Sequence, residues 1–387
     1  MKTRKDFFFR RFTKFFRRFT GSGTAFDFLL YEESIACCLQ GRQACGVFLL
    51  QSGLAVFAEW GYFCTFAELK KRHRELKILN FEDTEILSRA AVKPFATVGM
   101  FDGVHAGHRC LLEDLCRRAE AAGAETVVVS FLSHPRAVLG TVEGGFGLLQ
   151  TNERRFERIA SCGVDWLLPL AFTRELAMLR ASAFMDMLIE RVNPQEVLLG
   201  YDNRFGRKGD ESFDEIIACG EYRGVRVERS EGRVFCEGVE VSSTRIRKAL
   251  QEGRVDLAAE MLEEPYSIAG KVEEGMKIGR RIGFPTANIR LEGDKLIPKE
   301  GVYAVRVRTG GAMYGGVLNL GGKPTVDTEA WSCEVNVFDF SGDLYGMEVE
   351  VSFEAYLREQ RRFASLEALR EQIARDCDEA KRILCKG

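Results

Sequence analysis

A glycine-rich turn that carries two histidines joins an apolar stretch to an amphipathic one, and it constrains the fold more than any other segment. It reads Gly99-Met-Phe-Asp-Gly-Val-His-Ala-Gly-His108. The apolar stretch Phe95–Gly99 predicts a strand, and apolar residues at helical spacing after the turn predict a helix that ends at Gly123. Backbone N–H groups and the helix dipole favour an anion at such a turn, and glycines let the chain approach it closely. The segment therefore predicts a phosphate site.

Three of the chain's four histidines, His105, His108 and His134, lie within 30 residues of each other. A lone histidine at such a place is more often a surface residue or a helix cap than a ligand-binding group. The pairing of His105 with His108 around Gly107, and the shortage of histidine elsewhere, favour the functional interpretation. Both imidazoles are expected to donate hydrogen bonds to the same anion.

Short apolar strands alternate with helical stretches from Phe95 to about Leu262, which is typical of an α/β domain with a parallel sheet. Thr126–Phe131 predicts the next strand, so a β-α-β unit holds the turn at the carboxyl edge of the sheet, where ligands bind in open α/β folds. Further strands are predicted at Trp166–Pro169, Glu196–Gly200 and Val225–Glu228, which gives a sheet of about five strands.

The pattern changes near Pro265, beyond which strands alternate with glycine turns. Strands are predicted at Tyr266–Val272, Gly301–Thr309, Ala312–Leu320, Ser332–Phe340 and Glu348–Tyr356, followed by a helix from Ser365 to about Leu384. Short strands at this spacing predict a small antiparallel barrel closed by a C-terminal helix.

The charge and cysteine content narrow the functional classes. A formal net charge of -2 gives no overall attraction to nucleic acid or to a membrane, so small-molecule chemistry is the default expectation. The 12 cysteines contain no Cys-x-x-Cys pair and are scattered along the chain. This distribution favours reduced thiols in a cytoplasm over a zinc site or a disulfide framework.

Residues 1–77 do not match the rest of the chain. Phe8-Phe-Arg-Arg-Phe-Thr13 recurs as Phe15-Phe-Arg-Arg-Phe-Thr20, and the apolar run from Val47 to Ala58 is shorter than the roughly 20 residues that span a bilayer. One interpretation is an amphipathic membrane-surface or targeting peptide. We favour another, an atypical extension that is disordered or an artefact of an over-long gene model, because the recognisable patterns start after Lys77. Domains are expected at 78–262 and 263–387.

Two further motifs are expected to border the phosphate site. In Val241-Ser-Ser-Thr-Arg-Ile-Arg247, hydroxyl side chains can cap the following helix. The same segment offers Ser243, Thr244 and Arg245 to a polyphosphate. Asp202-Asn-Arg-Phe-Gly206 follows the strand that ends at Gly200. There Asp202 and Arg204 can order a nucleotide or a flavin, although loop charges are equally common at such a place.

The most specific motif of the second region is Gly279-Arg-Arg-Ile-Gly-Phe-Pro-Thr-Ala-Asn288. Pro285 stiffens a turn, Gly283 permits a close approach, and Thr286 and Asn288 place neutral oxygens two residues apart. Such oxygens suit Mg²⁺, which takes few protein ligands and otherwise keeps phosphates and waters. An ordinary turn explains the same residues. The chain has no P-loop motif, so a kinase activity requires another phosphate cradle.

Taken in order, these motifs resemble two domains of one enzyme family. The histidine turn is similar to the His-x-Gly-His signature of nucleotidyltransferases. Four segments resemble a riboflavin kinase domain: Gly279–Asn288, Gly316–Thr325, Glu334–Phe340 and Leu357–Arg358. From about residue 78 to 384 the chain resembles the bacterial bifunctional riboflavin kinase/FAD synthetase family. The resemblance implies an α/β Rossmann-like nucleotidyltransferase domain followed by a small antiparallel β-barrel riboflavin kinase domain with a C-terminal helix.

The resemblance also implies two ATP-dependent reactions: phosphorylation of riboflavin to FMN, and adenylylation of FMN to FAD with release of pyrophosphate. It makes Glu334 the general base of the kinase and Thr286 and Asn288 the ligands of Mg²⁺. It gives His105 and His108 the role of stabilising charge on the transferring phosphate. Nucleotide contacts are expected from Gly99, Phe101, Asp102, Gly107, Ser243, Thr244, Arg245, Gly279, Gly283 and Pro285, and flavin contacts from His134, Asp202, Asn203 and Arg358.

The chain departs from the family pattern at two places. Asn203 stands where the family usually has an aromatic residue, which motivates the alternative of a riboflavin kinase with weak or lost FAD synthesis. Glu263-Glu264-Pro265-Tyr266 replaces the usual Gly-Arg-Pro-Tyr at the domain junction, a change expected to be neutral.

The rival from another class is a flavin-binding regulator without turnover. The presence of Glu334 argues against it, because binding alone needs no base at the flavin hydroxyl. The expected partners are the small molecules ATP, riboflavin and FMN, with no nucleic acid and no stable membrane span. Whether the chain forms a homo-oligomer is left open.

Overall fold

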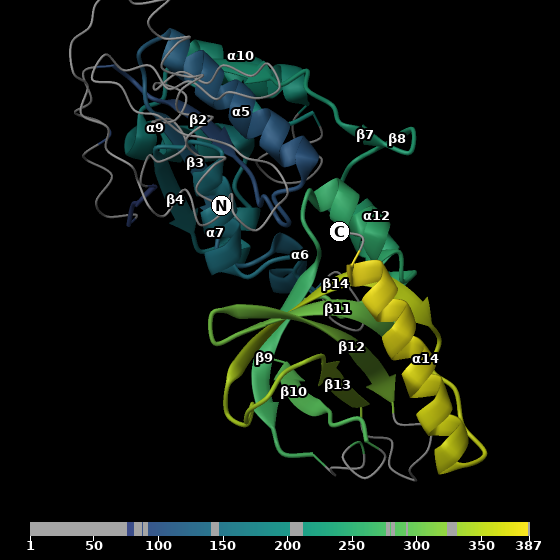
Figure 1. Cartoon of the computed structure of the whole chain (residues 1–387). Coiled ribbons are helices and arrows are strands. Elements are labelled where there is room, and N and C mark those ends of the chain that lie inside the picture. Colours follow the sequence, from purple (N-terminus) through teal and green to yellow (C-terminus); the bar gives the residue numbers. More distant parts are fainter. Residues whose placement is uncertain are drawn as a thin grey trace, which may run out of the picture. The chain divides into compact units, whose positions relative to one another are not determined.

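The computed structural model describes residues 76–80, 87, 92–140, 147–201, 212–275, 279, 283–291, 293–322 and 331–385. Arg74–Gly387 form one compact unit, and the described residues all belong to it (Figure 1). The predictions for residues 1–75 lie outside the described residues.

The first domain is built on a parallel sheet, as the alternating pattern predicts. Its six strands are ordered β1-β4-β3-β2-β5-β6, and every neighbouring pair is parallel. The strands are β1 (Lys77–Ile78), β2 (Phe95–Val98), β3 (Thr126–Phe131), β4 (Trp166–Leu170), β5 (Glu196–Leu199) and β6 (Arg226–Arg229). The five predicted strands are confirmed. The two-residue edge strand β1 was not predicted, because two residues show no periodicity, and it places Lys77 in the sheet.

Helices cover both faces of this sheet because the central strands are apolar on both sides. On one face, α5 (Ala106–Ala121) and α7 (Asn152–Ser161) enclose a buried cluster that includes Leu112 and Ile159. On the other face, α9 (Ala181–Val192) and α10 (Phe213–Tyr222) contribute Met185 and Ile216 to a second cluster. The short helices α6 (Pro135–Val138) and α8 (Arg174–Ala177) follow β3 and β4. The β-α-β unit thus places the turn between β2 and α5 at the carboxyl edge of the sheet.

A hairpin and two helices lead from the sheet to the second domain. The hairpin is formed by β7 (Phe235–Cys236) and β8 (Val239–Glu240), and α11 (Ser243–Gln251) and α12 (Val255–Leu262) follow it. Buried side chains of both helices, such as Leu250 and Met261, share one hydrophobic cluster with Tyr303 and Phe353 of the second domain. This cluster crosses the predicted boundary between residues 262 and 263.

The second domain is a closed antiparallel barrel with strand order β10-β13-β12-β11-β14-β9, which confirms the predicted architecture (Figure 1). The strands are β9 (Ser267–Glu273), β10 (Ala287–Leu291), β11 (Gly301–Thr309), β12 (Ala312–Gly322), β13 (Trp331–Val337) and β14 (Glu348–Arg358), and the C-terminal helix is α14 (Leu366–Leu384). Strand β10 was missed, because the Pro-Thr-Ala-Asn sequence indicated only a turn. Asn288 therefore lies on a strand and not in a turn.

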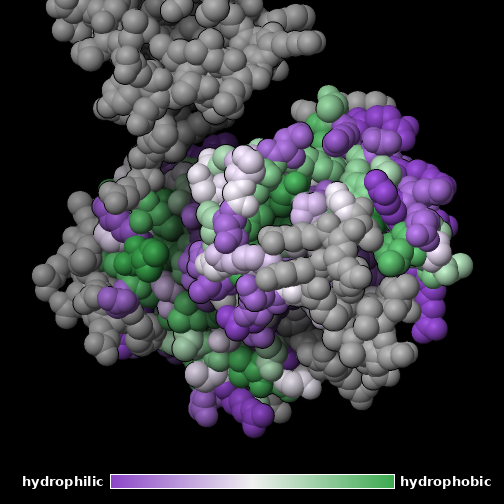
Figure 2. Space-filling view, turned by 60° about the horizontal axis from the view of Figure 1, so that its bottom comes forward, coloured by the Kyte–Doolittle hydropathy of each residue, from purple (hydrophilic) through white to green (hydrophobic). Residues whose placement is uncertain are grey.

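The barrel strands bury both of their faces in part. Val305, Leu318 and Val335 point into the barrel, whereas Val302 and Val317 point outward and pack against α14. On the face seen in Figure 2, hydrophobic residues in green are interspersed with hydrophilic residues in purple. Among the helices in the described part of the chain, none combines the length and the apolar character needed to cross a membrane.

Candidate functional site

The turn between β2 and α5 has an unusual backbone. Phe101 and Val104 have φ values of 52° and 34°, and Gly103 between them has 90°. The left-handed region is unfavourable for residues with a Cβ, and most of all for a β-branched one such as Val104. A Cβ at Gly103 would lie 2.9 Å from Leu149 Cδ1, so a larger residue would also have to displace the end of that side chain. Surrounding contacts must therefore hold this turn in its conformation.

His105 and His108 lie together at the start of α5. His105 is the N-cap residue, and its Nδ1 accepts a hydrogen bond from the His108 backbone N–H at 3.3 Å. The two rings are stacked, with centroids 3.6 Å apart and planes inclined by 16°. Because Nδ1 of His105 accepts, the neutral ring carries its proton on Nε2. Capping and ligand binding are therefore compatible, since they use different nitrogens of the same ring.

The electrostatics of the turn favour neutral histidines beside fixed positive charge. The pKa of His105 is lowered to about 4, chiefly by burial and in part by Arg247. The pKa of His108 is lowered by burial, by His105 and by Arg155. At neutral pH both imidazoles are thus uncharged donors, while the guanidiniums nearby supply the positive potential that suits an anion.

The carboxylate of Asp102 is enclosed and fully engaged by its neighbours. Its side chain is 2% exposed, it forms an ion pair with Arg247, and Oδ1 accepts the backbone N–H of Leu149 at 3.0 Å and of Gln150 at 3.3 Å. Burial raises the pKa of Asp102, and Arg247 and the two N–H groups oppose that rise. Asp102, predicted to contact the nucleotide, therefore stabilises the turn through hydrogen bonds and an ion pair within the protein.

The N-terminus of α11 meets the same turn. Ser242 is the N-cap and accepts the Arg245 backbone N–H at 3.3 Å, while the Ser243 hydroxyl donates to the Asp102 backbone oxygen at 2.8 Å. Ser243 and Thr244 are thus the first two residues of a helix whose positive end lies at the histidine turn. Two helix N-termini, those of α5 and α11, converge here, which is an arrangement suited to a polyphosphate.

Arg245 points elsewhere. Its guanidinium donates to the backbone oxygens of Cys236 at 2.5 Å and Val239 at 2.7 Å, which ties α11 to the β7–β8 hairpin. The described contacts of Arg245 are therefore structural. Its predicted contact with a nucleotide stays a prediction. Arg247, the last residue of the same motif, forms an ion pair with Asp102.

The remaining predicted residues of this domain lie close to the turn or outside the described residues. Gly99 donates its N–H to Val129 at 3.0 Å, and a Cβ on Gly107 would lie 3.3 Å from the His105 ring. His134 is the N-cap of α6, and its pKa is lowered to about 3 by burial, with Arg247 adding to the effect. Asp202 and Asn203 fall outside the described residues.

A second group of polar residues lies on the outside of the barrel, in a partial ring that also contains the apolar Val302. The strand registers pair Asn288 with Glu334, Glu334 with Asn319, Asn319 with Val302, and Val302 with Arg358. Residues paired across antiparallel strands point to the same face, and Val302 points outward toward α14. Asn288 and Glu334 therefore lie side by side on the outer wall of the barrel.

Thr286, just before β10, completes this group. Its hydroxyl lies 3.4 Å from Glu334 Oε2. We call Thr286, Asn288 and Glu334 the barrel-wall site. The structure thus brings together the three residues that sequence reasoning assigned to catalysis and metal binding in this domain, including two that lie 46 residues apart in the chain, Asn288 and Glu334.

The predicted phosphate segment runs directly beside the barrel-wall site. A Cβ on Gly279 would lie 2.3 Å from the Phe284 backbone oxygen and 3.2 Å from Thr286 Oγ1, so only glycine fits. Gly283 has a φ of 85°, in the region that favours glycine. Asn336 of β13, which the sequence gave no reason to select, donates its amide to the Pro285 backbone oxygen at 2.7 Å. This bond fixes the segment to the barrel.

Arg358 is bound to the C-terminal helix. Its guanidinium forms a two-point ion pair with Asp376 of α14, with N···O distances of 3.0 and 2.7 Å. Asp376 is 3% exposed, so this pair is nearly buried. Arg358 lies on the same ring as Glu334 but its partner in the structure is the helix, and its predicted contact with flavin stays a prediction.

Comparison with known proteins agrees with both sites. Family models for FAD synthetase and riboflavin kinase match residues 88–245 and 262–384. The bifunctional riboflavin kinase/FMN adenylyltransferase of Listeria monocytogenes is 34% identical over 292 residues, which cover 75% of this chain and 92% of the relative. The protein of the same name from Pseudomonas fluorescens is 40% identical over 290 residues, covering 74% and 91%. The chain belongs to the bifunctional riboflavin kinase/FMN adenylyltransferase family.

The family assignment gives each domain its type. The sheet is the adenylyltransferase (FAD synthetase) domain, and the barrel is the riboflavin kinase domain. A crystal structure described as a macrolide-efflux protein from Streptococcus pneumoniae is also similar, with a TM-score of 0.70 and 29% identity over 79% of this chain and 98% of that chain. The similarity covers both domains, so the two-domain architecture is shared.

The oxygens of the barrel-wall site fit Mg²⁺. The Thr286 hydroxyl, the Asn288 amide oxygen and the Glu334 carboxylate are hard donors of the type that this ion prefers. A Cβ on Gly275 would lie 1.9 Å from Asn288 Nδ2, so the chain leaves no room for a side chain against Asn288. Within the described residues, no group of three or more His, Cys, Asp or Glu side chains offers another metal site.

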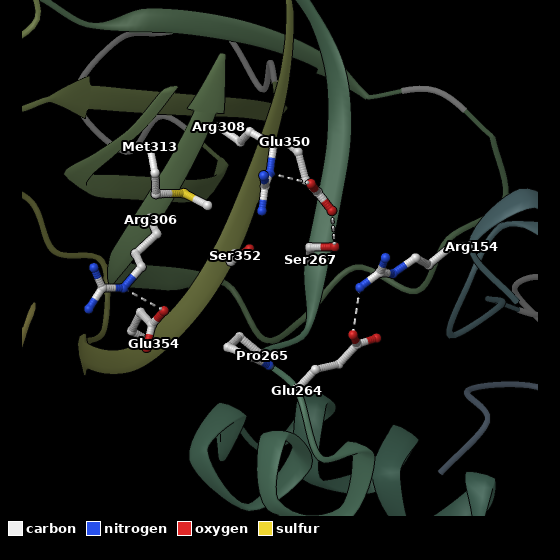
Figure 3. Close-up of a pocket in the computed structure, with 10 residues that line it drawn as sticks. All are labelled: Arg154, Glu264, Pro265, Ser267, Arg306, Arg308, Met313, Glu350, Ser352 and Glu354. Carbon is white, nitrogen blue, oxygen red and sulfur yellow. Dashed lines mark hydrogen bonds and ion pairs between the residues drawn. The ribbon is translucent and has the colours of Figure 1, made fainter. Parts of the chain in front are cut away.

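A charged pocket of about 390 Å³ lies between α7, the segment that joins α12 to β9, and the barrel strands β9, β11, β12 and β14 (Figure 3). It is separate from the barrel-wall site. It is lined by Arg154, Glu264, Pro265, Ser267, Arg306, Arg308, Met313, Glu350, Ser352 and Glu354. Each lining arginine faces a glutamate, at 2.7 Å for Arg154 and Glu264. The opposite charges cancel, so this pocket is not a polyphosphate cradle; its Arg154–Glu264 pair instead connects the two domains.

Sequence reasoning missed the arginines that surround the histidine turn. Arg155 is fully buried and donates to the backbone oxygens of Met100 at 3.2 Å and Phe131 at 2.6 Å. Burial lowers the pKa of Arg155 to about 10. A charged residue on an amphipathic helix normally indicates a solvent-facing position, so no local signal could have selected Arg155.

Proposed function

We propose that the chain makes FMN from riboflavin at the barrel-wall site and FAD from FMN at the histidine turn, using ATP in both steps. Family membership supports the pair of activities. The observation that most directly supports the first site is the meeting of Thr286, Asn288 and Glu334 on one wall of the barrel. Domain limits near residues 78, 262 and 387 are part of the proposal.

In the kinase step, Glu334 accepts the proton of the riboflavin 5′-hydroxyl as that oxygen attacks the γ-phosphorus of ATP. The bond from the γ-phosphorus to the bridging oxygen breaks, and ADP leaves with that electron pair. Thr286 and Asn288 would hold Mg²⁺, which when bound would neutralise charge on the phosphates. The Thr286 hydroxyl directs its proton toward Glu334, which leaves its lone pairs for the ion. Positioning and charge neutralisation supply most of the rate enhancement in such transfers.

In the adenylyltransferase step, an oxygen of the FMN phosphate attacks the α-phosphorus of ATP, and pyrophosphate leaves. The attacking group is already an anion, so no protein nucleophile is needed. His105 donates from Nε2, because its Nδ1 is occupied by the helix cap. His108, Ser243 and the N-terminus of α11 bind the charge that develops on the transferred and departing phosphates.

Flavin contacts by His134, Asp202, Asn203 and Arg358 remain part of the proposal, as do nucleotide contacts by the glycines of both phosphate segments. A cytoplasmic location is proposed on the cysteines: the eight in the described residues are all free thiols. The small-molecule partners are ATP, riboflavin and FMN.

The test is incubation of the full chain with riboflavin, ATP and Mg²⁺, followed by chromatographic separation of the flavins. The proposal expects FMN to form first and FAD to follow. FMN without FAD would favour the alternative of a kinase with lost adenylylation, which the departure at Asn203 motivated. A parallel incubation supplies FMN in place of riboflavin. Unchanged riboflavin in the first would contradict the kinase activity, unchanged FMN in the second would contradict adenylylation, and both together would favour a flavin-binding regulator.

A further inference from the structure

The junction between the domains, residues 263–266, is tied ionically to the adenylyltransferase domain. The Glu264 carboxylate accepts from Arg154 and Arg158 of α7, each at 2.7 Å, and from the Gln150 amide at 3.0 Å. Figure 3 shows Arg154 and Glu264 facing each other, with Glu264 on the segment between α12 and β9. The sequence change to glutamate at this position was expected to be neutral, but the structure gives it three partners.

Arg158 links Glu264 to the histidine turn. One of its terminal nitrogens, Nη1, pairs with Glu264, while the other, Nη2, donates to the backbone oxygens of Val104 at 3.2 Å and Leu262 at 2.6 Å. The Arg158 side chain is only 8% exposed. Burying a guanidinium without a paired charge is strongly unfavourable, and Glu264 supplies the carboxylate that pairs with Arg158. The position of Arg158 therefore depends on Glu264.

Val104 is the residue of the turn that most needs such support. Its φ of 34° is unfavourable for a β-branched side chain, and it directly precedes His105. A hydrogen bond to its backbone oxygen restrains the peptide plane between Val104 and His105. Movement of that plane would rotate the His105 ring away from the position in which it caps α5.

Two neighbouring contacts tie the same turn to the barrel side. Glu263 pairs with Arg109 at 2.8 Å, although its φ of 59° lies in the region where glycine usually ends a helix. Leu148 forms two backbone hydrogen bonds with the segment between β10 and β11. It accepts from Leu296 at 2.8 Å and donates to Asp294 at 2.7 Å. The residue after Leu148 donates to the carboxylate of the turn. The turn is thus held from the junction and from the barrel.

We propose that Glu264 and Arg158 are positioning residues for FMN adenylylation, through which the junction holds the histidine turn in its reactive geometry. Neither touches a reacting atom; they act through the Val104 backbone oxygen. The inference rests on the proposed adenylylation at this turn. The junction is therefore expected to affect adenylylation and not phosphorylation. Among the described hydrogen bonds and ion pairs, Glu264 and Arg158 contact no residue of the barrel-wall site.

The experiment compares Glu264→Gln and Arg158→Lys with the parental chain. Glu264→Gln keeps the shape of the side chain and removes its charge. Arg158→Lys keeps the charge, but its three donors sit on a single nitrogen, which cannot lie at the positions that Nη1 and Nη2 of Arg158 occupy separately. We expect kcat for FAD formation to fall between about 10-fold and 100-fold in both, the scale on which a displacement of about 1 Å acts. The kinase rate should stay within about twofold, and amide hydrogen exchange of residues 99–109 should become faster.

Glu354→Gln is the matched control. Glu354 lines the same pocket, pairs with Arg306 at 3.2 Å and has a similar side-chain exposure, 24% against 21% for Glu264. It should leave FAD formation and exchange at the turn unchanged. Parental FAD formation or parental exchange in Glu264→Gln would overturn the proposal, and so would an equal loss of both activities that follows the fraction of folded protein.

The two proposals fail in different ways. If the parental chain makes no FAD, the proposed adenylylation is wrong, and exchange at residues 99–109 still decides whether Glu264 positions the turn. If the parental chain makes FAD and Glu264→Gln does so equally well, the function stands and the positioning role is wrong.

Discussion

The histidine turn and the barrel-wall site differ in how they are held. At the turn, His105 is 5% exposed, its pKa is depressed, and backbone strain is balanced by contacts from α7, α11 and the junction. At the barrel wall, Thr286, Asn288 and Glu334 are positioned by strand register and one adjoining segment. The first arrangement needs the whole two-domain unit, whereas the second needs the barrel. Disturbance outside either site should therefore affect adenylylation more than phosphorylation.

The largest effect is expected at the barrel wall itself. Glu334→Gln retains the shape of the side chain and removes the proton acceptor, and a positioned general base contributes about 10²–10⁴-fold. Riboflavin phosphorylation should fall by that factor, while FAD formation from supplied FMN should persist. Rates of the two half-reactions, measured separately on one sample, check this. Parental phosphorylation by the variant would show that Glu334 is not the base.

His108→Ala tests the other site with a slightly smaller expected effect. It removes a donor aimed at charge on the transferring phosphate, and loss of one preorganised donor costs about 10²–10³-fold in rate. FAD formation from FMN and ATP should drop accordingly with the kinase rate preserved. A melting curve on the same samples separates this from unfolding. Near-normal FAD turnover in well-folded protein would refute the assigned role.

The buried histidine of the turn makes stability depend on pH. Because the pKa of His105 falls from 6.5 to about 4 on folding, the unfolded chain binds more protons between these values. The stabilising contribution is thus fully present above pH 6.5 and is lost as the pH falls toward 4. His105→Asn keeps a good N-cap residue and removes the titrating ring.

Denaturant unfolding across this pH range provides the measurement. The variant's free energy of unfolding should fall less steeply with decreasing pH than the parental value, by up to about 1.4 kcal/mol per pH unit. Parallel pH profiles in the two proteins would show that His105 does not titrate as its burial implies. FAD formation should nevertheless be impaired in the variant, since the Nε2 donor is gone.

The smallest effect is expected from removing residues 1–73. The two domains lie in the compact unit that begins at Arg74, and both family matches begin beyond residue 87. Both activities of the shortened chain should stay within about twofold of the parental values, since most changes away from a site are nearly neutral. Product analysis on the two proteins side by side checks this, and loss of either activity would give the extension a catalytic part.

Sequence reasoning succeeded where local pattern carries the information. The strand–turn–helix around the histidines and the change to short alternating strands after Pro265 both follow from periodicity and glycine placement. Strand β10 was lost because a proline-containing motif indicated a turn. The ion pair between Glu264 and Arg158 could not be predicted from local sequence, because its two residues lie far apart in the chain. Each of them alone would be expected on the solvent-exposed surface.

The same limit applies to predicted site residues that have partners within the protein. Asp102 and Arg245 carry the expected charge beside the expected turn, yet the structure engages Asp102 with Arg247 and Arg245 with hairpin carbonyls. Composition and spacing show which groups are near a site. They do not show which of those groups are already bonded to one another.

Mixing the two inactive variants tests the central claim most directly, because it asks whether one chain carries two separable active sites. Riboflavin, ATP and Mg²⁺ are supplied to Glu334→Gln, to His108→Ala and to an equimolar mixture, and FAD is measured over time. Neither variant alone should form appreciable FAD, and His108→Ala should accumulate FMN. The mixture should form FAD after a lag, as FMN released by one variant is adenylylated by the other. A mixture that accumulates FMN and makes no FAD, from variants that are folded, would contradict the account.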